Sequence, residues 1–410
     1  MRIFFFAIPV LALTTNSALA GPLRFEEALA RAEAQAPSLR AKTLEAEARR
    51  SALPAAGQLP DPKLGLGIDN FPVSGPPAGS FAEDSMTMAR VGISQEVPNA
   101  AKRHARTTRA RTDLAAAEVT LLSEARRVKV ATALAWIDLA YAERRLDALD
   151  RVLSRLAPLP SAAKAGVTSG AARPAQTLQI QQSLAALEDR RSELIAEVGR
   201  QRAVLSRWTG ELAPETAGDV PALIIDGAAL RASIAAHPDL GAAQTRVAQA
   251  EADVAIARAD KRPDWGFDVA YQRRADRYGD MVSAGVTISL PLFAGRRQDP
   301  MIAASTATAA AALASQEDMR RTLLADLEAG LAEHDMHHEQ WVRARETLLP
   351  LARDRTELET ASYAAGRAGL LDVIEAQSML ADSELQLLDR EAAVARDAAR
   401  LVLTFGGNSQ

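Results

Sequence analysis

Apolar residues recur every seven positions near the C-terminal end of the chain. The repeat runs from Val373 to Leu401, and each of its members is followed by a second apolar or small residue. This strict spacing is typical of helices that supercoil around neighbouring helices. Gly366 and Gly369 precede the run and supply the backbone freedom for a sharp reversal. The pattern predicts a long helical hairpin with a tight tip, and it places Asp372 in the first turn of the outgoing helix.

A weaker copy of this tip lies upstream, at Gly170. It leads into a leucine-bearing helix that ends near Trp208, as the later helix ends near Phe405. Pro37 and Pro238 break helical patterns at corresponding places. Residues 1–20 have the charged end, apolar core and small-residue cleavage site of a secretory signal peptide. We therefore expect two structural repeats after the signal, residues 21–220 and 221–410.

Two segments in each half alternate between apolar and polar or small residues. They are residues 64–69 and 86–95 in the first half, and residues 267–272 and 282–290 in the second. A period of two is the signature of a half-buried β-strand. Loops rich in glycine, proline or charge join the two segments of each pair. Each half is therefore predicted to contribute one β-hairpin.

Strands of about ten residues with one apolar face suit a transmembrane β-barrel. Four strands cannot close a barrel, and an open edge in lipid leaves backbone groups unsatisfied, so we expect several chains to pool their strands. Four polar residues would face the pore: Asp69, Arg90, Asp268 and Gln272. Trp265 and Tyr271 would lie on the lipid side. A soluble sheet with one polar face is the alternative.

A short segment containing proline follows each hairpin. Basic residues then mark the start of the next helix, at Lys102-Arg103 and at Arg296-Arg297. Long helical patterns then run from about 100 to 156 and from about 299 to 349. At 1.5 Å per residue such a helix spans on the order of 80 Å. We interpret Pro158, Pro160 and Pro350 as kinks near the far ends of these helices.

Composition narrows the class of protein. Apolar residues make up 48% of the chain but aromatic residues only 4%, which suits long, closely packed helices better than a globular core. The formal charge of −4 leaves no basic footprint for nucleic acid. Cysteine is absent, which excludes disulfides, thiolate metal sites and a lipidated N-terminal cysteine. No phosphate-binding loop or nucleophile motif indicates an enzyme or a cofactor.

The tip motif, its copy and the paired strands together resemble the TolC-like outer-membrane efflux protein family, over essentially the whole mature chain. The resemblance implies a homotrimer with a twelve-stranded barrel in the outer membrane lipid of a Gram-negative bacterium, continued by a twelve-helix tunnel in the periplasm. It also implies passive conduction from an inner-membrane pump, expected to be of the resistance-nodulation-division type, through a periplasmic adaptor. The adaptor would contact the tips at Gly170, Gly366, Arg367 and Gly369.

The same resemblance gives Asp372 and Glu375 a role. In the family, carboxylates at these motif positions line the periplasmic constriction, so a trimer would place rings of negative charge across the pore. The alternative is that both carboxylates only interact with the helix dipole. The candidate positions in the first half are Gln176, Thr177, Gln179 and Ile180, and all four are neutral.

Short stretches resemble the heavy-metal efflux branch of the family: residues 58–64, 70–72 and 94–98. They favour export of metal cations, and a channel for drugs or other organic compounds is the second reading. A soluble periplasmic coiled-coil adaptor is a third possibility, from a different class of protein.

Histidines cluster in the second long helix, where His334 and His338 are four residues apart. This spacing puts both rings on one helix face and can bind zinc or copper. The motif lacks the flanking elements of a zinc enzyme, and a solvated polar face is the simpler reading. We therefore predict no metal site, with His334 and His338 kept as the candidates.

Overall fold

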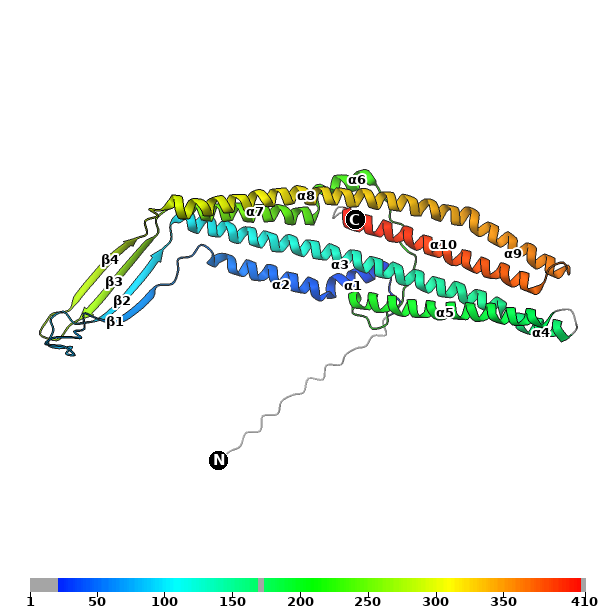
Figure 1. The fold of residues 1–410 in the computed structure, drawn as a ribbon, viewed down its shortest axis with the longest axis horizontal. Coiled ribbons are helices and arrows are strands. Elements are labelled where there is room, and N and C mark those ends of the chain that lie inside the picture. The colour runs from blue at the N-terminus through cyan, green and yellow to red at the C-terminus, as the bar shows by residue number, and fades with distance from the viewer. Residues whose placement is uncertain (1–20, 169–172, 407–410) are drawn as a thin grey trace, which may run out of the picture. The chain divides into compact units, whose positions relative to one another are not determined.

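The computed structural model describes residues 21–168 and 173–406 (Figure 1). The expected signal peptide and the tip glycine Gly170 lie outside the described residues. The chain forms two compact units. Unit 1 contains Arg126–Gly227 and Glu328–Gly406 together with the segment up to Ala36, and unit 2 contains Pro37–Ala125 and Ala228–Leu327. Each unit thus draws on both halves of the sequence.

Unit 2 contains an antiparallel four-stranded sheet in the order β1-β2-β3-β4. The strands are β1 (Lys63–Asp69), β2 (Met88–Val97), β3 (Trp265–Arg273) and β4 (Met281–Ile288). The two predicted hairpins are therefore present, and β2 pairs with β3 to join them. β1 and β4 are shorter than the expected ten residues. On their outer edges, β1 and β4 pair with no further strand among the described residues of the chain.

Helices continue from the sheet in unit 2. They are α2 (Pro37–Ala52) with the short η1 (Leu53–Ala55), the first part of α3 (Ala100–Leu156), α6 (Gly227–Ser233), η2 (Ile234–Ala236), α7 (Pro238–Ala259) and the first part of α8 (Ala294–Arg343). Polar side chains join α3 to α7: Arg109 Nε lies 2.8 Å from Asp253 Oδ1, and Gln249 donates to Asp113 at 2.7 Å. The break at Pro238 is explained by His237, whose Nδ1 accepts a hydrogen bond from Asp239 N and caps α7.

Unit 1 is helical. It contains α1 (Phe25–Gln35), the rest of α3, α4 (Leu159–Thr168), α5 (Pro174–Thr209), α9 (Leu349–Ala364) and α10 (Leu370–Phe405). The core lies where α1, α3, α5 and α10 meet. There the ring of Trp136 meets Phe25 edge-on at 5.5 Å, and its Nε1 donates to Leu23 O at 2.9 Å. The heptad residues of α10 are buried or partly buried, as the spacing predicts.

The prolines expected to kink the long helices differ in effect, because Pro158 follows a helix end whereas Pro350 lies within a continuous helical run. α3 ends at Leu156 and α4 follows after Pro158, while α8 passes through a π-helical turn, Ala344–Leu348 (η3), directly before Pro350. Proline cannot donate to the carbonyl four residues back, and the wider turn accommodates that loss. α8 starts at Ala294, earlier than expected, and includes Pro300 in its second turn.

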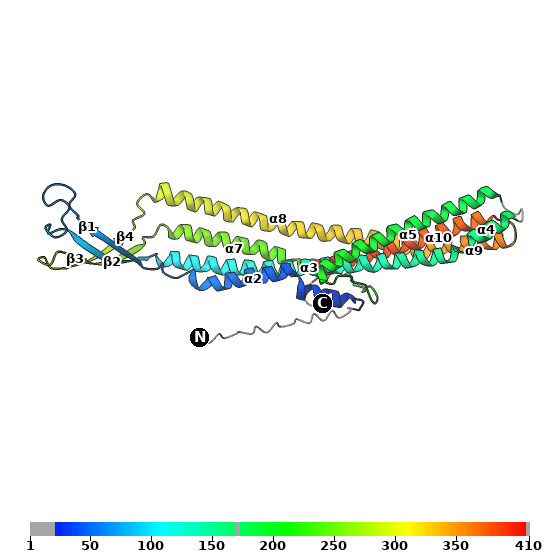
Figure 2. The ribbon, with the colours of Figure 1, turned by 90° about the horizontal axis from the view of Figure 1, so that it is seen from below.

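The order of elements is similar in the two halves: a broken helix, a hairpin, a long helix and a returning helix. In both views α9 and α10 run side by side as an antiparallel pair, and α5 runs back along the end of α3 (Figure 1, Figure 2). Within the described part of the chain, no helix is both long and apolar enough to cross a membrane.

Candidate functional site

The tip between α9 and α10 is a tight, hydrogen-bonded reversal. Gly366 has φ +70°, a left-handed conformation that side chains disfavour. Its N–H donates to Tyr363 O at 2.9 Å, and the N–H of Arg367 donates to Ser362 O at 2.8 Å. These bonds satisfy the last carbonyls of α9. Gly366 and the Arg367 side chain are therefore held at an exposed turn.

Asp372 caps the next helix. Its Oδ2 accepts a hydrogen bond of 2.7 Å from the backbone N–H of Gly369, the residue before α10. The side chain remains exposed, as does that of Glu375 one turn further along. Neither carboxylate has an ion-pair partner in the described ranges 21–168 and 173–406. The capping interaction therefore coexists with an unneutralised charge, so the two readings of Asp372 do not exclude each other.

Two further carboxylates extend this charge along α10. Asp382 and Asp389 follow Glu375 at intervals of seven, the same interval that separates the buried Val373 and Leu380 from the partly buried Leu387. Side chains at this interval share one helix face. All four carboxylates of the face are exposed: Asp372, Glu375, Asp382 and Asp389. We call this face the α10 acidic row. The sequence analysis singles out only Asp372 and Glu375. The seven-residue spacing also indicates Asp382 and Asp389.

Among the residues that the structure describes, only the last member of the α10 acidic row has a close cation. Arg145 Nη1 lies 2.5 Å from Asp389 Oδ1. Glu384, on a neighbouring face, lies 3.8 Å from Arg353. The first three carboxylates of the row therefore present net negative charge along the first half of α10.

The candidate positions of the first half are neutral and do not form a matching row. Ile180 is fully buried and packs against Ala163 and Ile374. The Gln179 side chain is exposed, and further along α5 the carboxylates alternate with arginines, as at Glu188 and Arg190. Negative charge at the described tips therefore comes from the second half.

The register of the sheet puts the four polar residues expected to face the pore on one face. Arg90 pairs with Gln272, and Asp268 pairs with Ser94, in the β2 to β3 ladder. Asp69 shares this face, because it lies two residues from Gly67, the partner of Arg90. Trp265 and Tyr271 lie on the opposite face with other exposed apolar residues: Leu64, Leu66, Ile68, Val91, Ile93, Phe267, Val269, Val282, Val286 and Ile288. One face of the sheet is thus continuously apolar and open to its surroundings.

The histidines of α8 separate into two environments. The rings of His334 and His338 lie 6.2 Å apart and line a cavity of about 500 Å³ with Trp341 and Glu391. Burial lowers the pKa of His334. His337 instead bonds to the buried Asp397 at 2.6 Å. Among the described residues no group of three or more metal-binding side chains comes together.

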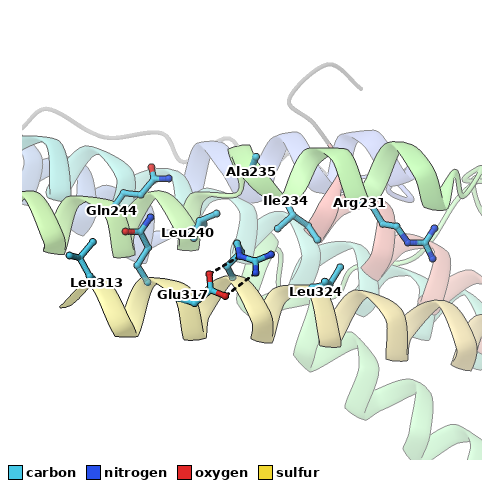
Figure 3. Close-up of a pocket in the computed structure, with 10 residues that line it drawn as sticks. Arg231, Ile234, Ala235, Leu240, Gln244, Leu313, Glu317 and Leu324 are labelled. Carbon is cyan, nitrogen blue, oxygen red and sulfur yellow. Dashed lines mark hydrogen bonds and ion pairs between the residues drawn. The ribbon is translucent and has the colours of Figure 1, made fainter. Parts of the chain in front are cut away.

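A second cavity, of about 530 Å³, lies in unit 2 between α8 and the segment from α6 to α7 (Figure 3). Ile234, Leu240 and Leu324 form apolar walls. Glu317 accepts hydrogen bonds of 2.7 to 2.9 Å from Arg320 and Arg321, which lower its pKa to about 2. Its lining contains no nucleophile paired with a base, so this cavity offers no catalytic arrangement.

Comparison with known proteins identifies the class of this molecule. Residues 229–407 match the family model described as outer membrane efflux protein. This part of the chain is therefore similar to the outer membrane efflux protein family. Members of this family are outer membrane channels of Gram-negative bacteria and not enzymes, so the similarity favours a channel over the soluble adaptor.

Two curated relatives extend the comparison. The cobalt-zinc-cadmium resistance protein CzcC of Cupriavidus metallidurans is 23% identical over 380 residues, which cover 90% of this chain and 86% of CzcC. Nodulation protein T of Rhizobium leguminosarum bv. viciae is 28% identical over 177 residues, 41% of this chain. That alignment spans only 36% of the nodulation protein.

Solved structures of efflux channels share the fold. The CmeC outer membrane channel of Campylobacter jejuni aligns with a TM-score of 0.78 and 13% identity, covering 93% of this chain and 85% of CmeC. CusC aligns with a TM-score of 0.78 and 15% identity, covering 94% and 92%. The chain is therefore mainly helical with a small sheet, in the TolC-like arrangement that the sequence predicted.

Proposed function

We propose that this efflux protein is the trimeric outer membrane channel of a tripartite system that exports heavy-metal cations by passive conduction. The observation that carries the proposal is the α10 acidic row. Three of its carboxylates, Asp372, Glu375 and Asp382, have no ion-pair partner among the residues described. Their charge is available to a passing cation.

A threefold assembly turns each of these side chains into a ring of three carboxylates. Rings of carboxylates across a narrow, low-dielectric passage concentrate cations and repel anions. Divalent metal ions gain most from such rings because the attraction scales with ionic charge. Near the tip, rings at Asp372 and Glu375 form the periplasmic gate, and separation of the tip helices opens it.

The sheet supports the assembly. Its apolar face is exposed in one chain, and β1 and β4 have free outer edges. Free edges are not tolerated in lipid, and four strands from each of three chains close a twelve-stranded barrel. The apolar face then contacts lipid, and Asp69, Arg90, Asp268 and Gln272 face the pore.

The proposed channel binds two partner proteins, a periplasmic adaptor and an inner-membrane pump. The exposed turn at Gly366, Arg367 and Gly369 is the contact for a periplasmic adaptor, together with the Gly170 tip. The adaptor connects the channel to an inner-membrane pump of the resistance-nodulation-division type. Residues 1–20 serve as the cleaved signal for export, and the absence of cysteine excludes lipidation at that residue.

The similarity to a cobalt-zinc-cadmium resistance protein over 90% of the chain favours metal cations over organic compounds. The direct test is resistance to zinc, cobalt and cadmium in cells that carry the cognate pump and adaptor but lack this gene. Restored resistance by the wild-type gene, and its reduction in an Asp372→Asn, Glu375→Gln, Asp382→Asn variant, is the expected result. Restored resistance to organic compounds, with no effect on metals, would establish the drug-channel reading instead.

A further inference from the structure

The connection from β4 to α8 in unit 2 exposes large apolar side chains. Leu290, Leu292 and Phe293 are 64%, 76% and 74% exposed. They come directly after Ile288, the last residue of β4. Exposed side chains of this size are costly in water unless something covers them.

Three unpaired arginines lie in the segments that border this connection. Arg296 and Arg297 are in the first turn of α8, and Arg262 lies between α7 and β3. All three side chains are exposed. In the described part of the chain, none of the three has an ion-pair partner.

The two neighbouring lysines, unlike these arginines, form ion pairs within the chain. Lys102 Nζ lies 2.9 Å from Asp260 Oδ1 and 2.7 Å from Asp264 Oδ2, and Lys261 pairs with Asp299. Asp264 is further fixed by the backbone N–H of Asn99 at 2.8 Å. These acidic side chains are therefore committed to the lysines, which leaves the arginines free for an anion from outside the chain.

Two of the arginines and Leu290 line a cavity of about 350 Å³, and Arg296, Leu292 and Phe293 are their neighbours in the chain. Arg262, Arg297 and Lys102 line it on the charged side, and Leu290, Pro291 and Met301 on the apolar side. Three cations face two carboxylates, Asp260 and Asp264, so the lining keeps an excess of positive charge. The cavity therefore suits an amphiphile with an anionic head.

The position along the sheet matches a membrane interface. Val97 pairs with Trp265, and Trp265 pairs with Ile288, so these residues lie together at the end of the sheet nearest the helices. Trp265 is 43% exposed on the apolar face. Aromatic side chains with adjacent arginines are typical of the boundary between acyl chains and phosphate groups.

We infer that this cavity binds an anionic phospholipid of the periplasmic leaflet. Arg262, Arg296 and Arg297 contact the phosphate, and the acyl chains lie along Leu290, Leu292 and Phe293. This inference rests on the proposed function, because it needs the sheet to cross the membrane. A free phosphate ion would use the arginines alone and would leave the apolar residues uncovered.

Native mass spectrometry of the delipidated protein with equal amounts of phosphatidylglycerol and phosphatidylcholine tests the inference. Wild type is expected to retain phosphatidylglycerol preferentially. Replacement of Arg262, Arg296 and Arg297 by Gln weakens that retention by about fivefold for each arginine removed. Leu292→Ser with Phe293→Ser weakens retention of both lipids, since both share the acyl chains.

The matched control removes three exposed arginines of unit 1, none of which has an ion-pair partner in the described residues: Arg151, Arg343 and Arg400, each to Gln. This variant is expected to bind phosphatidylglycerol as wild type does. Equal binding of the two lipids by wild type, or unchanged binding by the variant lacking Arg262, Arg296 and Arg297, overturns the inference. Displacement of phosphatidylglycerol by millimolar inorganic phosphate identifies a free-anion site and overturns it as well.

Failure of the proposed function is measured separately in the same samples. A trimeric mass and recovery from outer membranes report on the channel, and lipid preference reports on the cavity. A trimer from outer membranes without lipid preference contradicts only the phospholipid site. A soluble monomer contradicts the channel and the site together.

Discussion

The two halves of the chain have a similar order of elements but differ in where their charges are neutralised. After the first hairpin, Lys102 is held by Asp260 and Asp264. After the second, Arg296 and Arg297 remain without ion-pair partners in the described ranges. At the tips, α10 presents carboxylates, whereas Ile180 of α5 is buried and Gln179 is neutral.

This difference separates positions that build the fold from positions free to act on other molecules. A charge fixed by partners contributes to stability, and one without partners can act on a ligand or an ion at small cost in stability. In our proposal, two halves with a similar order of elements differ in role: the first supplies fixed contacts, and the second supplies the cation pathway and the lipid contact.

The largest expected effect on stability comes from Lys102. Lys102→Met leaves Asp260 and Asp264 without their cation, and we expect a loss of about 2 kcal/mol in the free energy of unfolding because the side chain is mostly buried. Arg297→Met, in the second half, is expected to change stability by no more than about 0.5 kcal/mol. Thermal unfolding in detergent measures both. Equal losses would remove the distinction between paired and unpaired cations.

Two substitutions of Asp372 distinguish the contribution of its helix-capping hydrogen bond from that of its negative charge. Asp372→Ala removes the acceptor for Gly369 N and is expected to cost about 1 kcal/mol. Asp372→Asn keeps an acceptor oxygen and loses only the charge, so its stability should stay close to that of wild type. Thermal unfolding of the two variants makes the comparison. A loss in Asp372→Asn equal to that in Asp372→Ala would mean that the charge itself stabilises the tip.

The sequence predicted much of this arrangement because the relevant signals are local. α3 has the predicted bounds, Ala100 and Leu156, since prolines and glycine-free helical sequence define them. Alternation placed Asp268 and Gln272 on one face of the sheet, as the register shows. Contacts between distant segments were not predictable: His337 with Asp397, or Lys102 with Asp264, which lie 60 and 162 positions apart.

His334 gives a smaller, pH-dependent effect in the second half. Burial lowers its pKa, so the folded state binds the proton less readily than the unfolded state. Stability is therefore complete above the ordinary value of 6.5 and falls as the pH decreases below it. His334→Gln should flatten this dependence in thermal unfolding between neutral pH and pH 5. His338→Gln, at the more exposed ring, is the control, and a flat wild-type profile would contradict the prediction.

Glu317 is expected to show the smallest effect. Its hydrogen bonds from Arg320 and Arg321 lower the pKa to about 2 from an ordinary 4.5. The contribution of this ion cluster is therefore present above pH 4.5 and is lost as the pH falls toward 2. Glu317→Gln should remove that part of the pH dependence of the melting temperature. An unchanged profile in the variant would show that these exposed pairs contribute nothing measurable.

The central claim is that the cation preference of the channel comes from the second half of each chain. The reversal potential across a planar bilayer under a salt gradient tests it most directly. Wild type is expected to be cation-selective, and Asp372→Asn with Glu375→Gln and Asp382→Asn should move the reversal potential close to zero. The control removes three exposed carboxylates of α5, by Glu188→Gln, Asp189→Asn and Glu193→Gln, and should keep the selectivity. An unchanged reversal potential in the α10 variant, or an equal shift in the α5 control, would contradict the account.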